Sequence, residues 1–376
     1  MTGMLAPMEL LRGILYGERA KHPIPPMDGA LFPNSRLDEL EVLDYNLSAP
    51  DDVAGDGNNG LLVNSERRLL ALGGNNEVRS VATFDSPVSA FARLPDGDLV
   101  VGLDGGGLVH LDARGRPLHT AATLDGRPLT GITAVTSDGD TGVYFTIGST
   151  RHNAADWVRD LMECNRNGLL GHWIPGHDPQ CWRHDLAFPN GVLMDDDGQH
   201  LVITEGWAHS VSRYQIQGSI LGEKQTLIDN LPGYPSRISA AGGGGYWLAV
   251  FAMRTQLVEM VLHDQAFKQD MMRSLAPELW IRPALASTGS HLEPLQMGGV
   301  RKLGIRKAWA PPRSYGLVLR VDNSGEVTES MHSRVGGHCH GVTAAREING
   351  RLLIVSRGSN RLLAAPVKQP VEGPNE

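Results

Sequence analysis

The stretch PDGDLVVGLD (95–104) decides the fold, because it joins a glycine-bearing turn directly to a short run of strand-forming residues. Most copies of this phrase follow one short β-type run and precede a further strand pair. A unit of about four strands, repeated along a chain, is typical of a β-propeller. The other five copies are GDGNNGLLVNSE (55–66), SDGDTGVYFTIGS (137–149), DDDGQHLVITEG (195–206), AGGGGYWLAVFA (241–252) and INGRLLIVSRG (348–358). Six copies predict an all-β chain with six blades.

The limits of the propeller follow from where the repeats begin and end. After the sixth copy only RLLAAPV (361–367) remains to form strand, so the last blade lacks one strand. LDELEVLDY (37–45) is the candidate that closes the ring. We therefore expect an N-terminal extension with a short amphipathic helix over 1–36, a single propeller over 37–370, and a disordered tail over 371–376.

Two segments interrupt the repeat. Residues 151–184 contain AADWVRDLMECNRNG, and residues 253–313 contain QLVEMVLHDQAFKQDMMRSLAPELW, both with helix-like spacing of apolar residues. Each follows the second strand of a blade, the third and the fifth respectively. We expect both insertions to carry short helices and to lie as lids on the same face of the disc.

Composition and charge exclude several classes of function. The 376 residues carry a net charge of −8, which argues against a nucleic-acid partner, since phosphate contacts need a positive surface. No stretch approaches the roughly 20 apolar residues of a membrane span, and the three cysteines form neither a disulfide framework nor a zinc motif. We expect a cytoplasmic protein that acts on a small molecule, with a homo-oligomer left open.

The residues that begin the innermost strands are the candidates for a site, because in a propeller they face the central channel. In the stretch GGHCHG (336–341), His338 and His340 are separated by two, so on a strand they would face one side and Cys339 the other. The alternative is that both histidines are exposed turn residues. By register the six starts fall near Asp51 and Asp52, Ser89, Gly131 to Thr133, Asn190, Ser236 and Arg237, and His338 and His340.

Three stretches resemble a known superfamily. They are LAFPNGVLMDDDGQHLVITEGWAHSVSRYQIQG (186–218), TLIDNLPGYPSRI (226–238) and GVYFTIGSTRH (142–152). The chain resembles the strictosidine synthase and gluconolactonase/regucalcin superfamily, and its bacterial strictosidine-synthase-like branch most of all. The similarity runs from about residue 25 to 367, and FPNG and NLPGYP are its most specific motifs. The resemblance implies a six-bladed propeller with an active site at the top of the channel.

The resemblance also implies a channel cation, often calcium, in the gluconolactonase and paraoxonase branches. Asp51, or Asp52 after a register slip of one residue, matches the acid of the first blade, and Asn190 matches the asparagine of the fourth; all offer hard oxygen ligands. Where family members commonly have GYPDN, this chain has Ser236 and Arg237. A guanidinium beside the site should weaken divalent binding. We therefore expect no certain cofactor, with a weakly bound Ca²⁺ or other divalent cation left open.

The expected function is that of a small-molecule enzyme, a hydrolase of lactones or related esters. His340 occupies the position of the acid–base glutamate of strictosidine synthases, and histidine titrates near neutral pH. We expect His340 as general base, His338 or His184 as its helper and Arg237 as stabiliser of the developing oxyanion. A metal-free lyase, condensing or isomerising enzyme and a non-catalytic binding propeller are the alternatives. Expected substrate-binding residues are His184, Asp185, Glu205, Trp207, Ser236 and Arg151.

Overall fold

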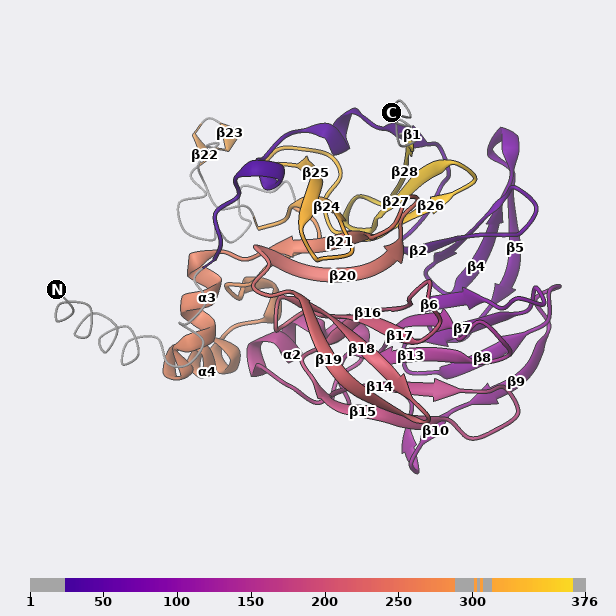
Figure 1. Ribbon diagram of the computed structural model, residues 1–376. Coiled ribbons are helices and arrows are strands. Elements are labelled where there is room, and N and C mark those ends of the chain that lie inside the picture. Colours follow the sequence, from indigo (N-terminus) through magenta and orange to yellow (C-terminus); the bar gives the residue numbers. More distant parts are fainter. Residues whose placement is uncertain (1–23, 288–300, 303–304, 307–312, 368–376) are drawn as a thin grey trace, which may run out of the picture.

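The computed structural model describes residues 24–287, 301–302, 305–306 and 313–367. Within them the chain forms six four-stranded antiparallel sheets arranged around a central axis, which confirms the six-bladed propeller (Figure 1). The predicted N-terminal helix and the predicted tail lie outside the described residues, as does part of the second insertion.

The blades follow one another along the chain, with the innermost strand first. Blade 1 is β2 (Pro50–Gly55), β3 (Leu61–Ser65), β4 (Arg68–Leu72) and β5 (Val78–Thr83). Blade 2 is β6 (Val88–Arg93), β7 (Leu99–Leu103), β8 (Gly107–Leu111) and β9 (Pro117–Ala121). Blade 3 is β12 (Ile132–Ser137), β13 (Val143–Ile147), β14 (Gly168–Trp173) and β15 (Gln180–Leu186). A two-stranded hairpin, β10 (Thr123–Leu124) with β11 (Arg127–Pro128), precedes blade 3.

The second half of the ring repeats this order and ends on a strand from the N-terminal side. Blade 4 is β16 (Pro189–Met194), β17 (His200–Glu205), β18 (Ser210–Gln217) and β19 (Ile220–Ile228). Blade 5 is β20 (Gly233–Ala240), β21 (Tyr246–Met253), β24 (Gly316–Val321) and β25 (Val327–Ser333). Blade 6 is β26 (Val342–Ile348), β27 (Arg351–Ser356), β28 (Arg361–Pro366) and β1 (Glu41–Leu43). Pairing of β1 with β28, Val42 opposite Leu363, closes the ring within the range that the sequence indicated.

The hydrophobic core is divided among the spaces between blades. Six clusters of buried side chains each join two neighbouring blades, as where Val53 and Val63 of blade 1 meet Val355 of blade 6. A seventh cluster lies between the helices of the two insertions and blades 4 and 5. It includes Met162 from the first insertion and Trp207 from blade 4. Strands buried on both faces explain why the repeat phrases are continuous apolar runs.

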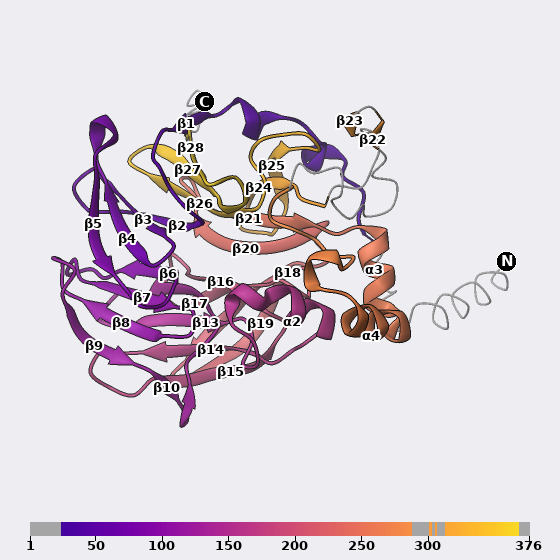
Figure 2. The same ribbon diagram turned by 180° about the vertical axis from the view of Figure 1, so that it is seen from behind.

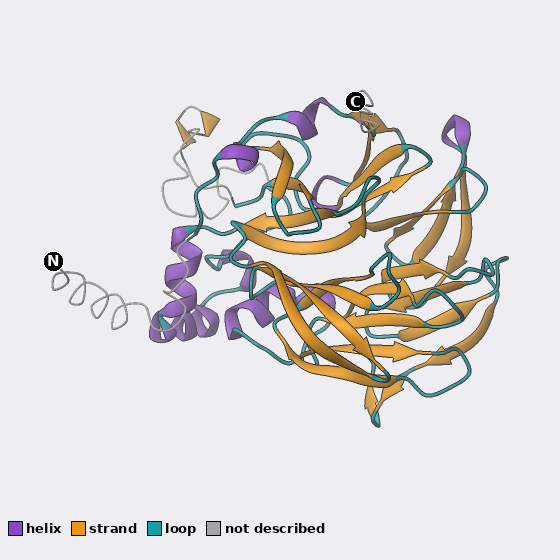
Figure 3. Cartoon of the chain, in the orientation of Figure 1, coloured by secondary structure: helices purple, strands orange, loops and turns teal. Residues whose placement is uncertain are grey.

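The helices of both insertions lie on one face of the disc (Figures 1 and 2). The first carries α2 (Trp157–Glu163), and the second carries α3 (Gln256–His263) and α4 (Gln265–Ser274). Thr255 and Asp264 cap α3 and α4, accepting hydrogen bonds from backbone N–H groups of the first turn. Figure 3 shows these helices gathered at one side of an otherwise β-stranded molecule.

The first insertion is shorter than predicted. Residues 168–186, expected as part of a lid over 151–184, are the third and fourth strands of blade 3. The sequence did not predict β14 as a strand because it contains two glycines. A Cβ on Gly171 would meet the Phe145 ring at 2.3 Å, and one on Gly168 would meet Pro189 at 2.3 Å. Close packing, not a loop, requires these glycines.

Candidate functional site in the central channel

Every inner strand carries a register shift at the residues that enter the channel. The shifts lie between Pro50 and Val53, Val88 and Ala90, Ile132 and Ala134, Pro189 and Gly191, Pro235 and Ile238, and Val342 and Ala344. A bulge of this kind takes a residue out of the ladder and redirects its side chain. The bulged residues are Asp51 and Asp52, Ser89, Thr133, Asn190, Ser236 and Arg237, and Thr343.

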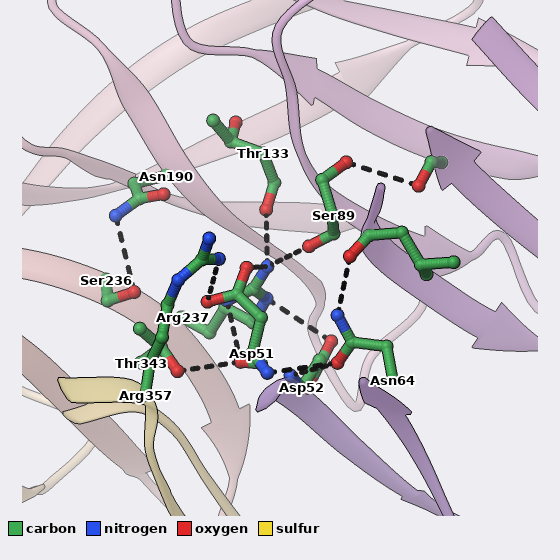
Figure 4. Close-up of polar contacts among 12 residues, drawn as sticks. Asp51, Asp52, Asn64, Ser89, Thr133, Asn190, Ser236, Arg237, Thr343 and Arg357 are labelled. Atoms are coloured by element: carbon green, nitrogen blue, oxygen red, sulfur yellow. Dashed lines mark hydrogen bonds and ion pairs between the residues drawn. The ribbon is translucent and has the colours of Figure 1, made fainter. Parts of the chain in front are cut away.

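Arg237 reaches from blade 5 across the axis and joins three other blades (Figure 4). Its Nη1 donates to the backbone oxygen of Asp51 at 3.0 Å, and its Nη2 donates to the backbone oxygens of Ser89 at 2.5 Å and Thr133 at 2.8 Å. The bulges leave these carbonyls without a ladder partner. Only 4% of Arg237 is exposed, so its guanidinium fills the axis of the channel.

Asp51 lies between two guanidinium groups. Its Oδ2 is 2.9 Å from Nη2 of Arg237, and its Oδ1 is 3.2 Å from Nη1 of Arg357. Burial alone would raise the pKa of Asp51, but the positive charges of Arg237 and Arg357 outweigh it and hold that pKa below its usual value. The carboxylate is therefore ionised at neutral pH. It lines the pocket with 8% of its surface exposed.

The neighbouring carboxylate belongs to the floor of the channel. Asp52 is almost fully buried, and its two oxygens each lie 3.1 Å from a guanidinium nitrogen of Arg346. Its Oδ2 is also 3.3 Å from Nε of Arg237. Burial opposes the charge of Arg237, but the attraction of Asp51 and Asp52 prevails and raises the pKa of that guanidinium above its usual value.

Above this floor lies a pocket of about 340 Å³. Its floor is the set of inner-strand residues, and Arg357, with 34% of its side chain exposed, forms part of its polar wall. The roof comes from both insertions: Trp157 of α2 and Leu285 of the second insertion line it. Phe251 packs edge-on against Trp157, with ring centroids 5.3 Å apart. The site therefore joins a charged floor to an apolar roof.

The GGHCHG stretch lies beside this pocket, not in it. It is a loop between blades 5 and 6, because β26 begins only at Val342, and Thr343 takes the place expected for His340. His340 is 5% exposed; its Nδ1 lies 2.9 Å from the Ser314 hydroxyl and its Nε2 2.9 Å from the Arg334 backbone oxygen. Since a carbonyl only accepts, Nε2 carries the proton.

The expected strand register placed His338 and His340 on the same side of a strand, facing one pocket. In the structure the two histidines do not share a pocket. His338 is exposed and lines a separate groove with Asp38 and Tyr315. Cys339 is buried in the cluster between blades 5 and 6. Gly341 has φ +63°, and a Cβ there would meet the Leu285 oxygen at 2.6 Å, so this glycine lets the second insertion cross above the loop.

The other expected substrate-binding residues divide among several places. His184 and Asp185 lie on β15 and line a different pocket, next to the β10–β11 hairpin. Glu205 is buried, and its Oε2 accepts a hydrogen bond from the Ala187 N–H at 2.8 Å. Arg151 is exposed and does not line the channel pocket. Of that set, only Ser236 lies in the channel.

Trp207 follows β17 of blade 4 and packs beneath the lid helices. It lies in the apolar cluster under the helices, stacked on Phe188 with ring centroids 4.2 Å apart. Its indole N–H donates to Oδ1 of Asp160 in α2 at 2.6 Å. The same cluster contains Met271, and the partly buried Met272 packs against it, whereas Met260 on α3 is exposed.

Sequence reasoning missed Arg357, Thr343 and Asp104. Arg357 and Asp104 each follow the second strand of a blade directly, after LLIVS and LVVGL respectively. Asp104 accepts hydrogen bonds from the N–H groups of Ala154 at 2.8 Å and Ala155 at 3.1 Å and so anchors the first insertion. The sequence signal common to both is their place directly after the apolar run of a repeat phrase.

The channel does not fit the cation that the resemblance implies. Asp51, the expected first-blade ligand, is already paired with Arg237 and Arg357. Nδ2 of Asn190 lies 3.3 Å from the Ser236 hydroxyl. Within the described residues no group of three or more His, Cys, Asp and Glu side chains could hold a metal ion. A fixed guanidinium on the axis would repel a divalent ion placed there.

Comparisons with known proteins support the resemblance. A family model described as strictosidine synthase matches residues 134–219. The adipocyte plasma membrane-associated protein of Mus musculus is 25% identical over 376 aligned positions, covering 94% of this chain and 84% of that protein. These matches confirm the sequence resemblance to strictosidine-synthase-like proteins.

Solved structures share the fold at low identity. A gluconolactonase from Xanthomonas campestris superposes with a TM-score of 0.56 and 14% identity, covering 92% of this chain and 95% of that one. Regucalcin from Agrobacterium tumefaciens, described as a calcium-binding protein, superposes with a TM-score of 0.53 and 12% identity, covering 88% and 92%. Gluconolactonase and regucalcin are thus neighbours of this chain in fold.

The predicted cytoplasmic location is contradicted. The matched relatives from mouse, cattle, rat and human, each aligned over 94% of this chain, are named plasma membrane-associated proteins. In the part of the chain that the structure describes, no helix is both long and apolar enough to cross a membrane. The absence of an apolar run was therefore insufficient ground for the expected location, because association with a membrane does not require one.

Proposed function

We propose that this chain is a small-molecule enzyme that hydrolyses lactones or related esters in the channel pocket, without a bound metal. The observation that carries the proposal is the pair of Asp51 and the half-exposed Arg357 at the base of a pocket roofed by apolar side chains. A carboxylate and a guanidinium beside one another supply a proton acceptor and an oxyanion stabiliser. A gluconolactonase is among the solved structures with this fold.

Each group that lines the pocket has a separate role in the proposed reaction. The substrate carbonyl oxygen would lie against the open N–H groups of Arg357, which stabilise the negative charge that develops there. Water adds its oxygen to the carbonyl carbon while its proton passes to the Asp51 carboxylate. The ester C–O bond then breaks, and the protonated Asp51 returns the proton to the departing oxygen. The apolar roof, with Trp157 and Phe251, holds the body of the substrate and excludes other water.

His340 stays a prediction as general base. Its ring nitrogens are bonded to Ser314 and Arg334, and it lies outside the residues that line the pocket. Asp51 lines the pocket directly, so it is the base we propose. The two assignments differ in the pH at which activity would be lost.

The proposal is tested by truncating Arg357. A panel of lactones and of aliphatic and aromatic esters is assayed with the wild-type protein, Arg357→Met and Arg351→Met. Arg351 begins the same strand, β27, and pairs with Glu41 on the outside of the blade, which makes it a matched control. We expect Arg357→Met to lower kcat/KM by about 10²–10³-fold, the usual cost of one oxyanion donor, and Arg351→Met to leave it unchanged. Equal activity of all three proteins, or no turnover of any panel member, would overturn the proposal.

A further inference from the structure

We infer that Arg237 is a built-in cation that occupies the position of a divalent ion in this propeller. Its guanidinium lies in a shell made of oxygen atoms: the backbone oxygens of Asp51, Ser89 and Thr133, and carboxylate oxygens of Asp51 and Asp52. The five distances lie between 2.5 and 3.3 Å. This inference does not depend on the reaction proposed above, and its test needs no substrate.

The composition of the shell is that of a site for a hard cation. Calcium in proteins takes carboxylate oxygens and backbone carbonyl oxygens and accepts irregular geometry. Here the bulges of three inner strands free one carbonyl each and turn it to the axis. Two carboxylates add negative charge. In this chain the cation is part of the protein, because Arg237 of the fifth blade supplies the positive charge.

The guanidinium makes the shell unavailable to free ions. It is nearly fully buried, and removing it from the shell would leave two buried carboxylates facing three carbonyl oxygens. The attraction of Asp51 and Asp52 favours its charged form. An incoming calcium ion would have to displace a tethered cation, so the wild-type protein should bind calcium at the axis weakly or not at all.

Arg237 also ties the ring together. A single side chain from blade 5 bonds to blades 1, 2 and 3, and the Thr343 hydroxyl of blade 6 donates to the Asp51 oxygen at 2.8 Å. A metal ion would make the same kind of link among the inner strands. Replacing Arg237 by a short neutral residue should therefore destabilise the ring and open a cation site in one step.

The test follows thermal unfolding of the full chain with and without calcium chloride. Wild-type protein should show no change in Tm with calcium. Arg237→Asn should unfold about 4–6 °C lower without calcium, since it removes one of the two guanidinium partners of each buried carboxylate. Calcium should raise the Tm of Arg237→Asn progressively with its concentration, by about 3–4 °C at a concentration a hundred times the dissociation constant. Isothermal titration calorimetry should give one site in Arg237→Asn only.

Three variants serve as controls. Arg254→Asn removes another buried arginine, which bonds Asn230 and Glu259 away from the channel, and should lose stability without responding to calcium. Arg237→Asn combined with Asp51→Asn should also fail to respond. Arg237→Lys keeps the charge but cannot span three carbonyls, so its Tm should fall without a calcium response.

Either of two results would overturn the inference. One is stoichiometric calcium binding by the wild-type protein, and the other is a folded Arg237→Asn whose Tm and calorimetry ignore calcium. If Arg237→Asn does not fold in either condition, Arg237→Lys decides: a Tm equal to that of the wild-type protein would show that the forked contacts do not matter.

Discussion

The carboxylate of Asp51 faces two guanidinium groups, and this surrounding fixes the pH at which it titrates. Because Arg237 and Arg357 lower its pKa from the usual 3.8, Asp51 loses its function as a base only when the pH falls below that value. We predict that kcat/KM stays level from neutral pH down to about pH 5. With a histidine as base, kcat/KM would begin to fall at a higher pH, since free histidine titrates near pH 6.5.

The pH–rate profiles of wild-type protein, Asp51→Asn and His340→Ala separate the two. Asp51→Asn should lose about 10²–10⁴-fold in kcat/KM and His340→Ala should retain most of it. An acidic limb near pH 6.5 that disappears in His340→Ala would return the role to the histidine. Melting curves of each variant show whether a lost activity reflects lost folding.

The sequence predicted most of the residues that enter the channel, but it predicted the wrong residue for the inner strand of the sixth blade. The register of five inner strands was correct, which brought Asp51, Ser89, Thr133, Asn190 and Arg237 together. In the sixth blade His340 precedes Gly341 and Val342 just as Asn190 precedes Gly191 and Val192, yet the bulge falls at Thr343. Where a bulge falls depends on pairing with the next strand, and the local letters do not encode it.

The first insertion is held to the propeller by a buried hydrogen bond between Trp207 and Asp160. We predict that Trp207→Phe, which leaves that carboxylate oxygen without the indole donor, lowers the free energy of unfolding by about 1–3 kcal/mol. Amide hydrogen exchange of residues 157–163 should become faster, because α2 loses this bond. Trp247→Phe removes a comparable bond to Glu347 between blades 5 and 6 and should leave exchange in α2 unchanged. Unchanged exchange in Trp207→Phe would show that packing alone holds the lid.

The elements themselves were largely readable, except where packing overrode the local signal. The second strands of all six blades coincide with the repeat phrases, apart from Met253 at the end of β21, since turn glycines and strand-forming residues agree there. The strand β14, GLLGHW, did not resemble a strand because two of its six residues are glycines that neighbours require. Such a requirement arises from contacts with Phe145 and Pro189 and is invisible before the blades are packed.

The whole ring depends on a strand and a short turn from the N-terminal side. Leu37, in the short turn Arg36–Glu39 before β1, is fully buried in the cluster between blades 5 and 6. Val42 in β1 is 46% exposed. We predict that Leu37→Ala lowers the free energy of unfolding by about 2–5 kcal/mol and Val42→Ala by less than about 1 kcal/mol. Urea unfolding of both variants measures this. Equal, small losses would mean that the ring stays closed without this anchor.

The central claim is that the channel works with its own arginines in place of a metal ion. The most direct measurement is hydrolysis of the lactone and ester panel by wild-type protein before and after dialysis against a chelator, followed by addition of calcium. The account predicts turnover of at least one panel member, with the same kcat/KM in all three conditions. Activity that is lost with the chelator and restored by calcium would contradict it.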